Sequence, residues 1–391
     1  MKPRHYCTYF DRRYAAQGLA LWLSLRRHDP AAVLWVLALD AATADAIRAL
    51  GEESLRAVPL AELEAADREL AAARENRSWV EYVFTLSPCW PRYLLAGGAK
   101  IEMEAITYCD ADLAFFASPA ALWGELGAGS VLIAEHRFPP YLRHLETRGR
   151  FNVGVLCFRN DARGRAVLED WRARCIAWCH DRVEPGRYAD QKYLDAWPET
   201  FAGVVVSRRA GVNLAPWNWM NFRYGYVNVH AGEEEAAARN AGGETNVMGA
   251  GGSPERRVRD NAPYPRSLSV DGAPLVVFHF ARFRPLGGRR VDSGQLEYGV
   301  MPLRLRSWIY GRYWQLLQEA AGRLAAVAPE LARPVSVARG KRAAWKTLLL
   351  ALAFGSTWWR VGPWWIGSGF GLGRYSGHVL MWVRGRRTGG R

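Results

Sequence analysis

Two carboxylates spaced two residues apart lie within an otherwise apolar segment, residues 106–116, at Asp110 and Asp112. A buried strand that ends in two acids requires a positive partner for them, because an uncompensated charge is costly to bury. Two carboxylates at i and i+2 can reach one hard divalent cation, which prefers oxygen ligands and often also holds phosphate groups. Short acidic triplets are common in solvated turns, so Asp-x-Asp alone is a weak signal. Its position directly after a strand favours a metal–diphosphate site over a turn.

The segments around the acidic pair alternate between strand-like and helical patterns. Strands are expected at 4–10, 33–39, 55–60, 130–134, 151–158, 204–207 and 275–283, and helices at 14–28, 42–50, 61–77, 79–95, 161–179 and 303–332. This alternation predicts an α/β fold with a mixed, mainly parallel sheet covered by helices on both faces. Ligands gather at the carboxyl ends of such strands, so Asp11, Asp110 and Asp112 are expected to converge there.

Four further segments carry polar residues suited to such a site. They are Thr8-Tyr9-Phe10-Asp11-Arg12-Arg13-Tyr14, Phe151-Asn152-Val153-Gly154-Val155, Asp190-Gln191-Lys192-Tyr193-Leu194 and Val277-Phe278-His279-Phe280. Together with Asp-x-Asp, they make the chain resemble metal-dependent nucleotide-sugar glycosyltransferases of the GT-A fold, specifically glycosyltransferase family 8. That family carries Asp-x-x-Tyr, Asp-x-Asp, Phe-Asn-x-Gly, Asp-Gln and a late His in the same order. The resemblance covers residues 4–286.

The resemblance implies that Asp110, Asp112 and His279 bind Mn²⁺ or Mg²⁺. Mixed oxygen and imidazole ligands favour Mn²⁺. The cation would bridge the two donor phosphates and stabilise the nucleoside diphosphate as it leaves. A histidine in an aromatic strand is by itself more often a core residue, and only the Asp-x-Asp pair makes the metal role the favoured one.

The resemblance also implies a nucleotide site. Its residues would be Thr8, Asp11, Tyr14, Asp110, Ala111 and Arg284. Asp11 and Tyr14 match positions that hold the base and ribose, and the Tyr14 ring can stack on the base. Arg284 lies one place before the family's phosphate-binding Lys, and Arg282 replaces a family Gly. Either guanidinium suits phosphate oxygens, but loss of the Gly puts the backbone path in doubt, and Arg13 in place of Asn can alter base recognition.

For the donor sugar, the resemblance implies contacts from Asn152, Asp190 and Gln191. Asp190 would bind sugar hydroxyls, and Gln191 would act near the anomeric carbon, with retention of configuration. Asn152 has an alternative as an amide bonded to neighbouring backbone. An inverting enzyme would instead need a carboxylate base for the acceptor hydroxyl, and Glu135 is the candidate. The aromatic and amide-rich segment 213–219 can stack on a sugar or simply pack in a loop.

The chain changes character after Glu330. No acidic residue follows, whereas eleven of its basic residues do, so the net charge of +14 arises mostly in this tail. We expect a catalytic domain at 1–330, with a mobile insertion at 232–261, and a Trp-rich tail at 331–391. The tail can lie on an anionic membrane surface, fold back onto the body, or bind an acidic polymer; nucleic acid is the least favoured partner.

The composition bounds the function. The chain has 391 residues, half of them hydrophobic, which allows a large core. Six scattered cysteines suit a reducing compartment. Neither an export signal nor a membrane-spanning segment is evident. We therefore expect a protein of the cytoplasm or of the cytoplasmic face of the inner membrane. The resemblance implies that it transfers a hexose from a UDP-hexose to a glycan or lipid-linked acceptor.

Two other functions compete with this hypothesis. A nucleotidyltransferase also uses acidic metal sites on such sheets, but it usually carries a Gly-rich loop after the first strand, whereas residues 11–14 contain no Gly. A non-catalytic membrane- or polyanion-binding protein would show no metal-dependent affinity for nucleotides.

Overall fold

The computed structural model describes residues 3–227, 267–287, 290–295, 298–299 and 301–332, and the backbone of 357–361 and 364–367. The predicted insertion at 232–261 and most of the tail lie outside these residues. The two proposed domain boundaries therefore remain predictions.

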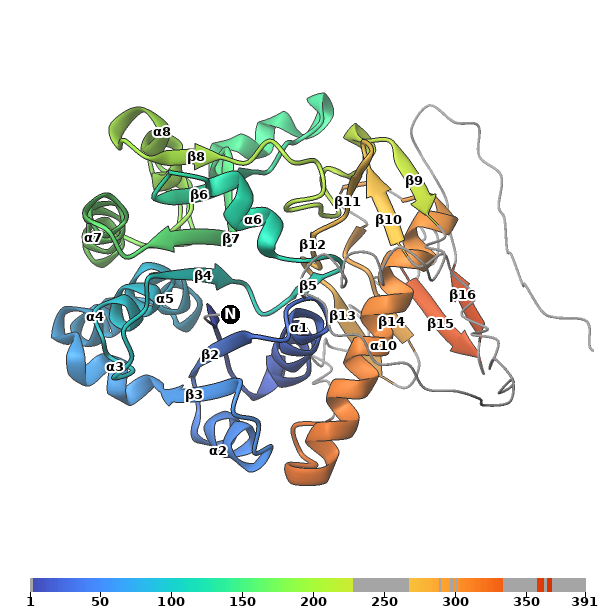
Figure 1. Cartoon of the computed structure of the whole chain (residues 1–391), viewed down its shortest axis with the longest axis horizontal. Coiled ribbons are helices and arrows are strands. Elements are labelled where there is room, and N and C mark those ends of the chain that lie inside the picture. The colour runs from blue at the N-terminus through green and yellow to red at the C-terminus, as the bar shows by residue number, and fades with distance from the viewer. Residues whose placement is uncertain are drawn as a thin grey trace, which may run out of the picture.

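A seven-stranded sheet forms the centre of the molecule (Figure 1). Its order is β3 (Leu55–Pro59), β2 (Ala32–Ala38), β1 (Arg4–Phe10), β4 (Ala105–Cys109), β7 (Phe151–Arg159), β6 (Val131–Glu135) and β8 (Val204–Val206). β7 runs antiparallel to both of its neighbours, and the other pairs are parallel. The expected mixed, mainly parallel sheet is confirmed.

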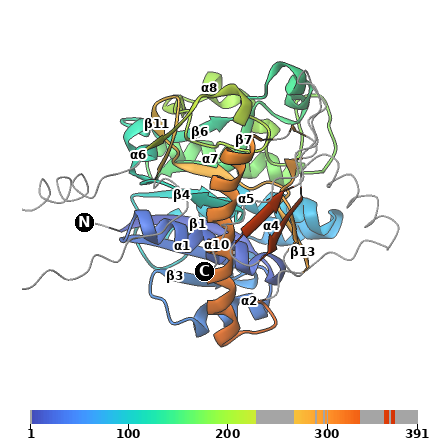
Figure 2. The same cartoon turned by 90° about the vertical axis from the view of Figure 1, so that its right-hand side faces the viewer.

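Helices cover both faces of this sheet. One face carries α3 (Leu60–Ala66), α4 (Arg68–Ala73), α5 (Trp79–Leu95), α7 (Ala162–Ala177) and α8 (Trp197–Thr200), whose apolar residues share a core with the strands. The other carries α1 (Ala15–His28), α2 (Ala41–Ala49), α6 (Ala120–Leu126) and α10 (Leu303–Val327). Figure 2 shows α10 crossing in front of α1.

The helix expected at 61–77 is broken, which corrects the sequence interpretation. Asp67 separates α3 from α4, and its carboxylate accepts a hydrogen bond from the Leu70 amide at 3.0 Å, as a helix cap does. Arg172 from α7 pairs with the same buried carboxylate at 2.5 Å. An Ala- and Glu-rich pattern does not reveal this partner, which lies 105 residues away.

Three small sheets complete the described fold. β5 (Leu113–Phe115) pairs with β12 (Val277–His279), and β9 (Tyr224–Val227), β10 (Ser267–Val270) and β11 (Ala273–Pro274) form a second sheet. The third contains β13 (Arg284–Gly287), β14 (Arg290–Asp292), β15 (Thr357–Val361) and β16 (Trp364–Gly367). The backbone of tail residues 357–361 thus pairs with β14.

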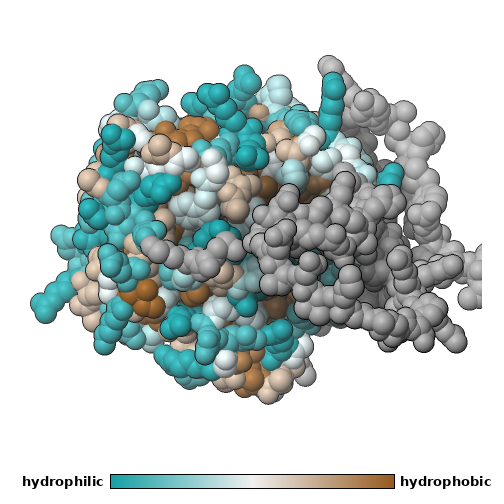
Figure 3. Space-filling model, in the orientation of Figure 1, coloured by the Kyte–Doolittle hydropathy of each residue, from teal (hydrophilic) through white to brown (hydrophobic). Residues whose placement is uncertain are grey.

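The described surface mixes polar and apolar residues. On the face seen in Figure 3, hydrophobic residues lie in small separate patches among hydrophilic ones. Among the described residues, no helix has both the length and the apolar character needed to cross a membrane.

Candidate metal centre and its surroundings

Asp110, Asp112 and His279 meet at the carboxyl end of β4. The two acids lie in the turn between β4 and β5, and β12 pairs with β5 so that His279 is opposite Leu113. This pairing brings His279 Nε2 within 3.6 Å of Asp110 Oδ2 and 3.2 Å of Asp112 Oδ1. One ligand atom from each of the three side chains lies within 4.8 Å of the others. Asp110, Asp112 and His279, the carboxylate–histidine cluster, are therefore close enough to hold one cation.

The charges in this cluster favour a cation. Burial raises the pKa of Asp110, and the nearby charge of Asp112 raises it further, whereas His279 acts in the opposite direction. Burial lowers the pKa of His279, but the attraction of Asp112 and Asp110 outweighs it, so this pKa lies above its ordinary value. Two carboxylates outweigh the charge of one imidazole in either of its protonation states, and a divalent cation would neutralise the excess negative charge.

Asn152 fixes the tautomer of His279. Its Oδ1 accepts hydrogen bonds from the Gly154 amide at 3.1 Å and from His279 Nδ1 at 3.2 Å. Because the carboxamide oxygen must accept both bonds, Nδ1 carries a proton, so Nε2 is the ring nitrogen that faces the two carboxylates and that would coordinate a cation in the neutral ring. Such a partner of a metal-binding histidine orients the ring for coordination.

Gly154 makes room for this contact. A β-carbon added there would lie 2.5 Å from Asn152 Oδ1 and 2.7 Å from His279 Nδ1. Atoms of a real side chain cannot approach so closely without displacing their neighbours. The spacing of Asn and Gly in β7 therefore has a physical cause at this site.

His136 is part of the same network and was not predicted from sequence. Asn152 Nδ2 lies 3.3 Å from His136 Nε2, and His136 Nδ1 lies 3.3 Å from the Arg150 carbonyl. His136 therefore donates through Nδ1 and accepts through Nε2. Burial lowers its pKa to about 3, so the ring is neutral at physiological pH. No sequence motif marks this residue, because its role comes from its distance to Asn152 in space.

Asp190 and Gln191 lie next to this network. Gln191 Oε1 accepts from Asn152 Nδ2 at 3.3 Å, and Gln191 Nε2 donates to the Arg148 carbonyl at 3.1 Å. Asp190 is only 5% exposed. Burial and the charge of Asp110 raise the pKa of Asp190 to about 7. The structure therefore brings the predicted sugar-contacting residues close to the carboxylate–histidine cluster.

The predicted nucleotide-binding residues have different environments. Asp11 accepts hydrogen bonds from the Arg13 amide and side chain, and Tyr14 is 47% exposed. Packing around the Tyr14 phenol and the charge of Asp112 raise its pKa, whereas Arg284 lowers it, so Asp112 and Arg284 each lie within electrostatic range of Tyr14. Thr8, by contrast, is fully buried.

Three other sequence expectations concern the surroundings of the site. Ala111, between the two acids, is half-buried. Glu135 is held in an ion pair with Arg150 at 2.5 Å. In the segment 213–219, Trp217 is buried and its ring packs edge-on against His279 with centroids 5.2 Å apart. Trp217 therefore supports His279, and with it the carboxylate–histidine cluster, from the loop side.

The strand expected at 275–283 ends early, at His279. Arg282 then adopts a left-handed backbone with φ of +62°, and its guanidinium lies over the Tyr298 ring at 6.0 Å. Glycine adopts this conformation without strain, whereas Arg does so at a cost of about 1–2 kcal/mol. Arg282 therefore adopts the backbone conformation that a glycine would allow at this position, where the resembling family has one.

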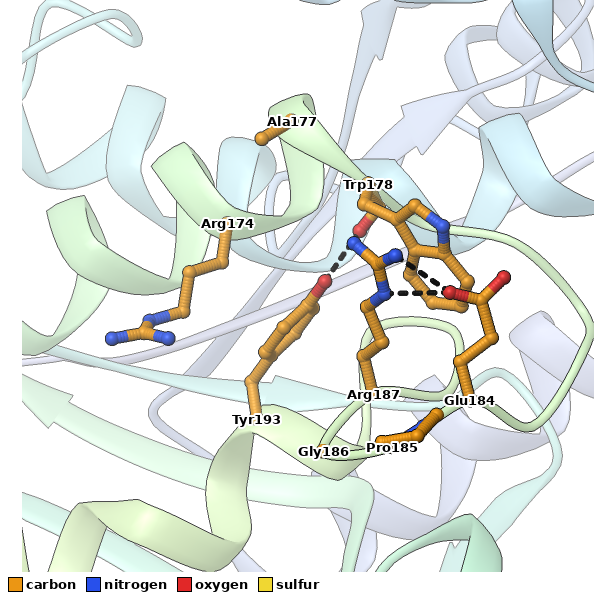
Figure 4. Close-up of a pocket in the computed structure, with 8 residues that line it drawn as sticks. All are labelled: Arg174, Ala177, Trp178, Glu184, Pro185, Gly186, Arg187 and Tyr193. Atoms are coloured by element: carbon orange, nitrogen blue, oxygen red, sulfur yellow. Dashed lines mark hydrogen bonds and ion pairs between the residues drawn. The ribbon is translucent and has the colours of Figure 1, made fainter.

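A separate hollow of about 550 Å³ lies beside the end of α7 (Figure 4). Trp178, Glu184, Arg187 and Tyr193 are among its lining residues. Arg187 pairs with Glu184 at 2.6 Å and stacks on Trp178 at 4.5 Å, so its charge is already compensated. The carboxylate–histidine cluster contributes no residue to this hollow, and we place the candidate site at the cluster.

Comparison with known proteins identifies relatives without an assigned function. No family model matches the chain. Two Bacillus subtilis (strain 168) proteins described as uncharacterized match it. YfnD is 31% identical over 228 residues, 58% of this chain and 72% of its own length. YfnF is 30% identical over 286 residues, 71% of this chain and 81% of its own length.

Two solved structures are among those to which the chain is similar. The galactosyltransferase LgtC in complex with donor and acceptor sugar analogues is 16% identical, with a TM-score of 0.43, over 82% of this chain and 99% of that chain. The glycosyltransferase GlyE of Streptococcus pneumoniae TIGR4 is 14% identical, with a TM-score of 0.39, over 87% of this chain and 66% of that chain. At these identities and TM-scores, the description of the fold rests on the strand order of the chain itself.

Proposed function

The chain belongs to the family of the Bacillus subtilis proteins YfnD and YfnF, and we propose that it is a glycosyltransferase that uses a divalent cation and a nucleotide-diphosphate sugar. The observation that carries this proposal is the convergence of Asp110, Asp112 and His279 within 4.8 Å at the carboxyl end of β4. Five motifs of glycosyltransferase family 8, in the same order along the chain, supply the reaction class.

The donor set fits Mn²⁺ or Mg²⁺. Asp110, Asp112 and the unprotonated Nε2 of His279 would hold the cation, and the imidazole favours Mn²⁺. When bound, the cation stabilises negative charge on the diphosphate of the leaving nucleotide. Asn152 holds the His279 ring in the required tautomer. Tyr14, which lies within electrostatic range of Asp112 and of Arg284, would contact the nucleotide base, and Arg284 would contact a phosphate.

The sugar would lie between the cluster and the Asp190–Gln191 pair. Gln191 and Asn152 are hydrogen-bonded to each other and so form one polar wall. The buried Asp190 carboxyl would bind a sugar hydroxyl. Glu135, the base that an inverting mechanism would need, is engaged by Arg150. This arrangement favours transfer with retention of configuration.

The donor is expected to be a UDP-hexose and the acceptor a glycan or a lipid-linked sugar. The proposed location is the cytoplasm, where the six cysteines, all free and buried, would stay reduced. The basic, Trp-rich tail would bring the enzyme to an anionic membrane that carries the acceptor.

Donor hydrolysis tests this proposal. The full chain would be incubated with Mn²⁺ and a panel of UDP- and GDP-hexoses, and the released nucleoside diphosphate would be measured beside Asp112→Asn. We expect release from at least one donor, and its loss in the variant and in EDTA. Release that is equal in wild type and variant would contradict the assignment of the site.

A further inference from the structure

The buried carboxamide of Asn152 forms four hydrogen bonds, which use its two lone pairs and its two protons once each. Its Oδ1 accepts from the Gly154 amide at 3.1 Å and from His279 Nδ1 at 3.2 Å. Its Nδ2 lies 3.3 Å from His136 Nε2 and 3.3 Å from Gln191 Oε1. Turning the carboxamide over would put its NH₂ group against the Gly154 N–H, so only one orientation satisfies all of these partners.

Two backbone groups set the direction of these bonds. The Gly154 N–H can only donate, so the atom that it meets is the Asn152 oxygen. The Arg150 carbonyl can only accept, and it lies 3.3 Å from His136 Nδ1, so this nitrogen carries the proton. In the neutral ring, His136 Nε2 therefore accepts one of the two Nδ2 protons of Asn152.

The His136 ring is held in place by contacts outside the carboxylate–histidine cluster. It stacks on the Phe138 ring with centroids 4.6 Å apart and an angle of 9° between the planes. The Trp217 ring packs against it at 5.3 Å. The His136 carbonyl accepts hydrogen bonds from Trp217 Nε1 at 3.0 Å and from Asn218 Nδ2 at 2.9 Å. His136 is therefore a fixed point to which the Asn152 carboxamide is attached.

We propose that His136 is a positioning residue that holds the Asn152 carboxamide, and through it the His279 imidazole, in the orientation that binds the cation. A buried amide proton without an acceptor is costly. Loss of His136 Nε2 would therefore turn Asn152 toward another acceptor, and the bond from His279 Nδ1 to Asn152 Oδ1 would be lost with it. This inference rests on the proposed function.

The test measures Mn²⁺ affinity of the full chain in the presence of UDP, from the resonance signal of free Mn²⁺. His136→Asn keeps a polar group near the Nδ1 position only, whereas His136→Gln can place its Oε1 near the Nε2 position. We expect His136→Asn to weaken Mn²⁺ binding about fivefold, as loss of one hydrogen bond does, and His136→Gln to stay within about twofold of the wild type.

A double substitution shows whether His136 acts through Asn152. In an Asn152→Ala background, His136→Asn should weaken Mn²⁺ binding no further, because the connection is already cut. His5→Asn is the matched control, since it changes another buried histidine, on β1, whose Nδ1 accepts from Trp35 Nε1 at 3.2 Å. It should leave Mn²⁺ affinity unchanged.

Three results would overturn the positioning role. They are Mn²⁺ affinity in His136→Asn equal to that of His5→Asn, equal losses in His136→Asn and His136→Gln, and a His136→Asn effect that persists in full beside Asn152→Ala. If His136→Asn fails to fold by circular dichroism, His136→Phe, which keeps a ring against Phe138 but offers no acceptor, takes its place. Absence of Mn²⁺ binding in the wild-type chain would overturn this role and the proposed function together, whereas binding that these substitutions leave unchanged would overturn the positioning role alone.

Discussion

Asn152 Oδ1 accepts a hydrogen bond from His279 Nδ1 at 3.2 Å across 127 residues of sequence. This bond uses the Nδ1 proton and turns Nε2 toward Asp110 and Asp112, which makes the amide a determinant of cation binding. Asn152→Ala should lower Mn²⁺ affinity 10- to 100-fold in calorimetric titrations. Asn160→Ala, which removes an amide bonded to the Leu95 and Met103 carbonyls, is the control. Equal affinities in the two variants would exclude the orienting role.

Gly154→Ala should disrupt the same contact by steric overlap. The added methyl group would lie 2.5 Å from Asn152 Oδ1, so Asn152 and His279 must move apart. We expect a loss of about 1–3 kcal/mol in the free energy of unfolding and a clear loss of Mn²⁺ binding. Gly124→Ala on α6, where nothing lies within 4 Å, should leave Mn²⁺ binding unchanged and raise the free energy of unfolding by about 0.5–1 kcal/mol, because Ala favours a helix more than Gly does. Retention of both quantities in Gly154→Ala would show that the site tolerates a side chain there.

His136 should make the protein acid-sensitive. Its pKa of about 3 in the folded state lies below the value of about 6.5 in an unfolded chain. Protons therefore bind the unfolded state preferentially as the pH falls below 6.5, and stability declines. At pH 5 this single group should cost about 2 kcal/mol.

Urea unfolding at pH 7.5 and pH 5 measures this effect. The loss of stability between the two values should be about 2 kcal/mol smaller in His136→Asn than in the wild type. Equal losses would mean that His136 is not buried in its neutral form.

Arg282→Gly tests the strained turn after β12. Glycine adopts φ of +62° freely, so the change should relieve about 1 kcal/mol of strain, partly offset by loss of the Arg282 contact with Tyr298. Arg282→Val should instead lower the melting temperature, because a branched side chain resists this conformation. A Val variant as stable as the Gly variant would contradict the left-handed backbone.

The sequence predicted those helices, strands and site residues that local patterns of residues determine. The order of motifs identified Asp110, Asp112 and His279 as one group, and the alternating helices and strands gave the sheet. Contacts between distant segments were not readable. The break at Asp67 depends on Arg172, and the hydrogen bond between the Tyr9 and Ser87 hydroxyls depends on how α5 packs against β1. His136 was missed for the same reason, since its partner Asn152 is a neighbour only in space.

Calorimetric titration of UDP into the full chain, with Mn²⁺ and then with EDTA, tests the central claim most directly. The cluster of Asp110, Asp112 and His279 predicts binding with Mn²⁺, no measurable binding with EDTA, and loss of binding in Asp112→Ala. GDP in place of UDP tests the base. Failure of both nucleotides to bind with Mn²⁺, or equal binding with EDTA, would contradict a cation-dependent donor site.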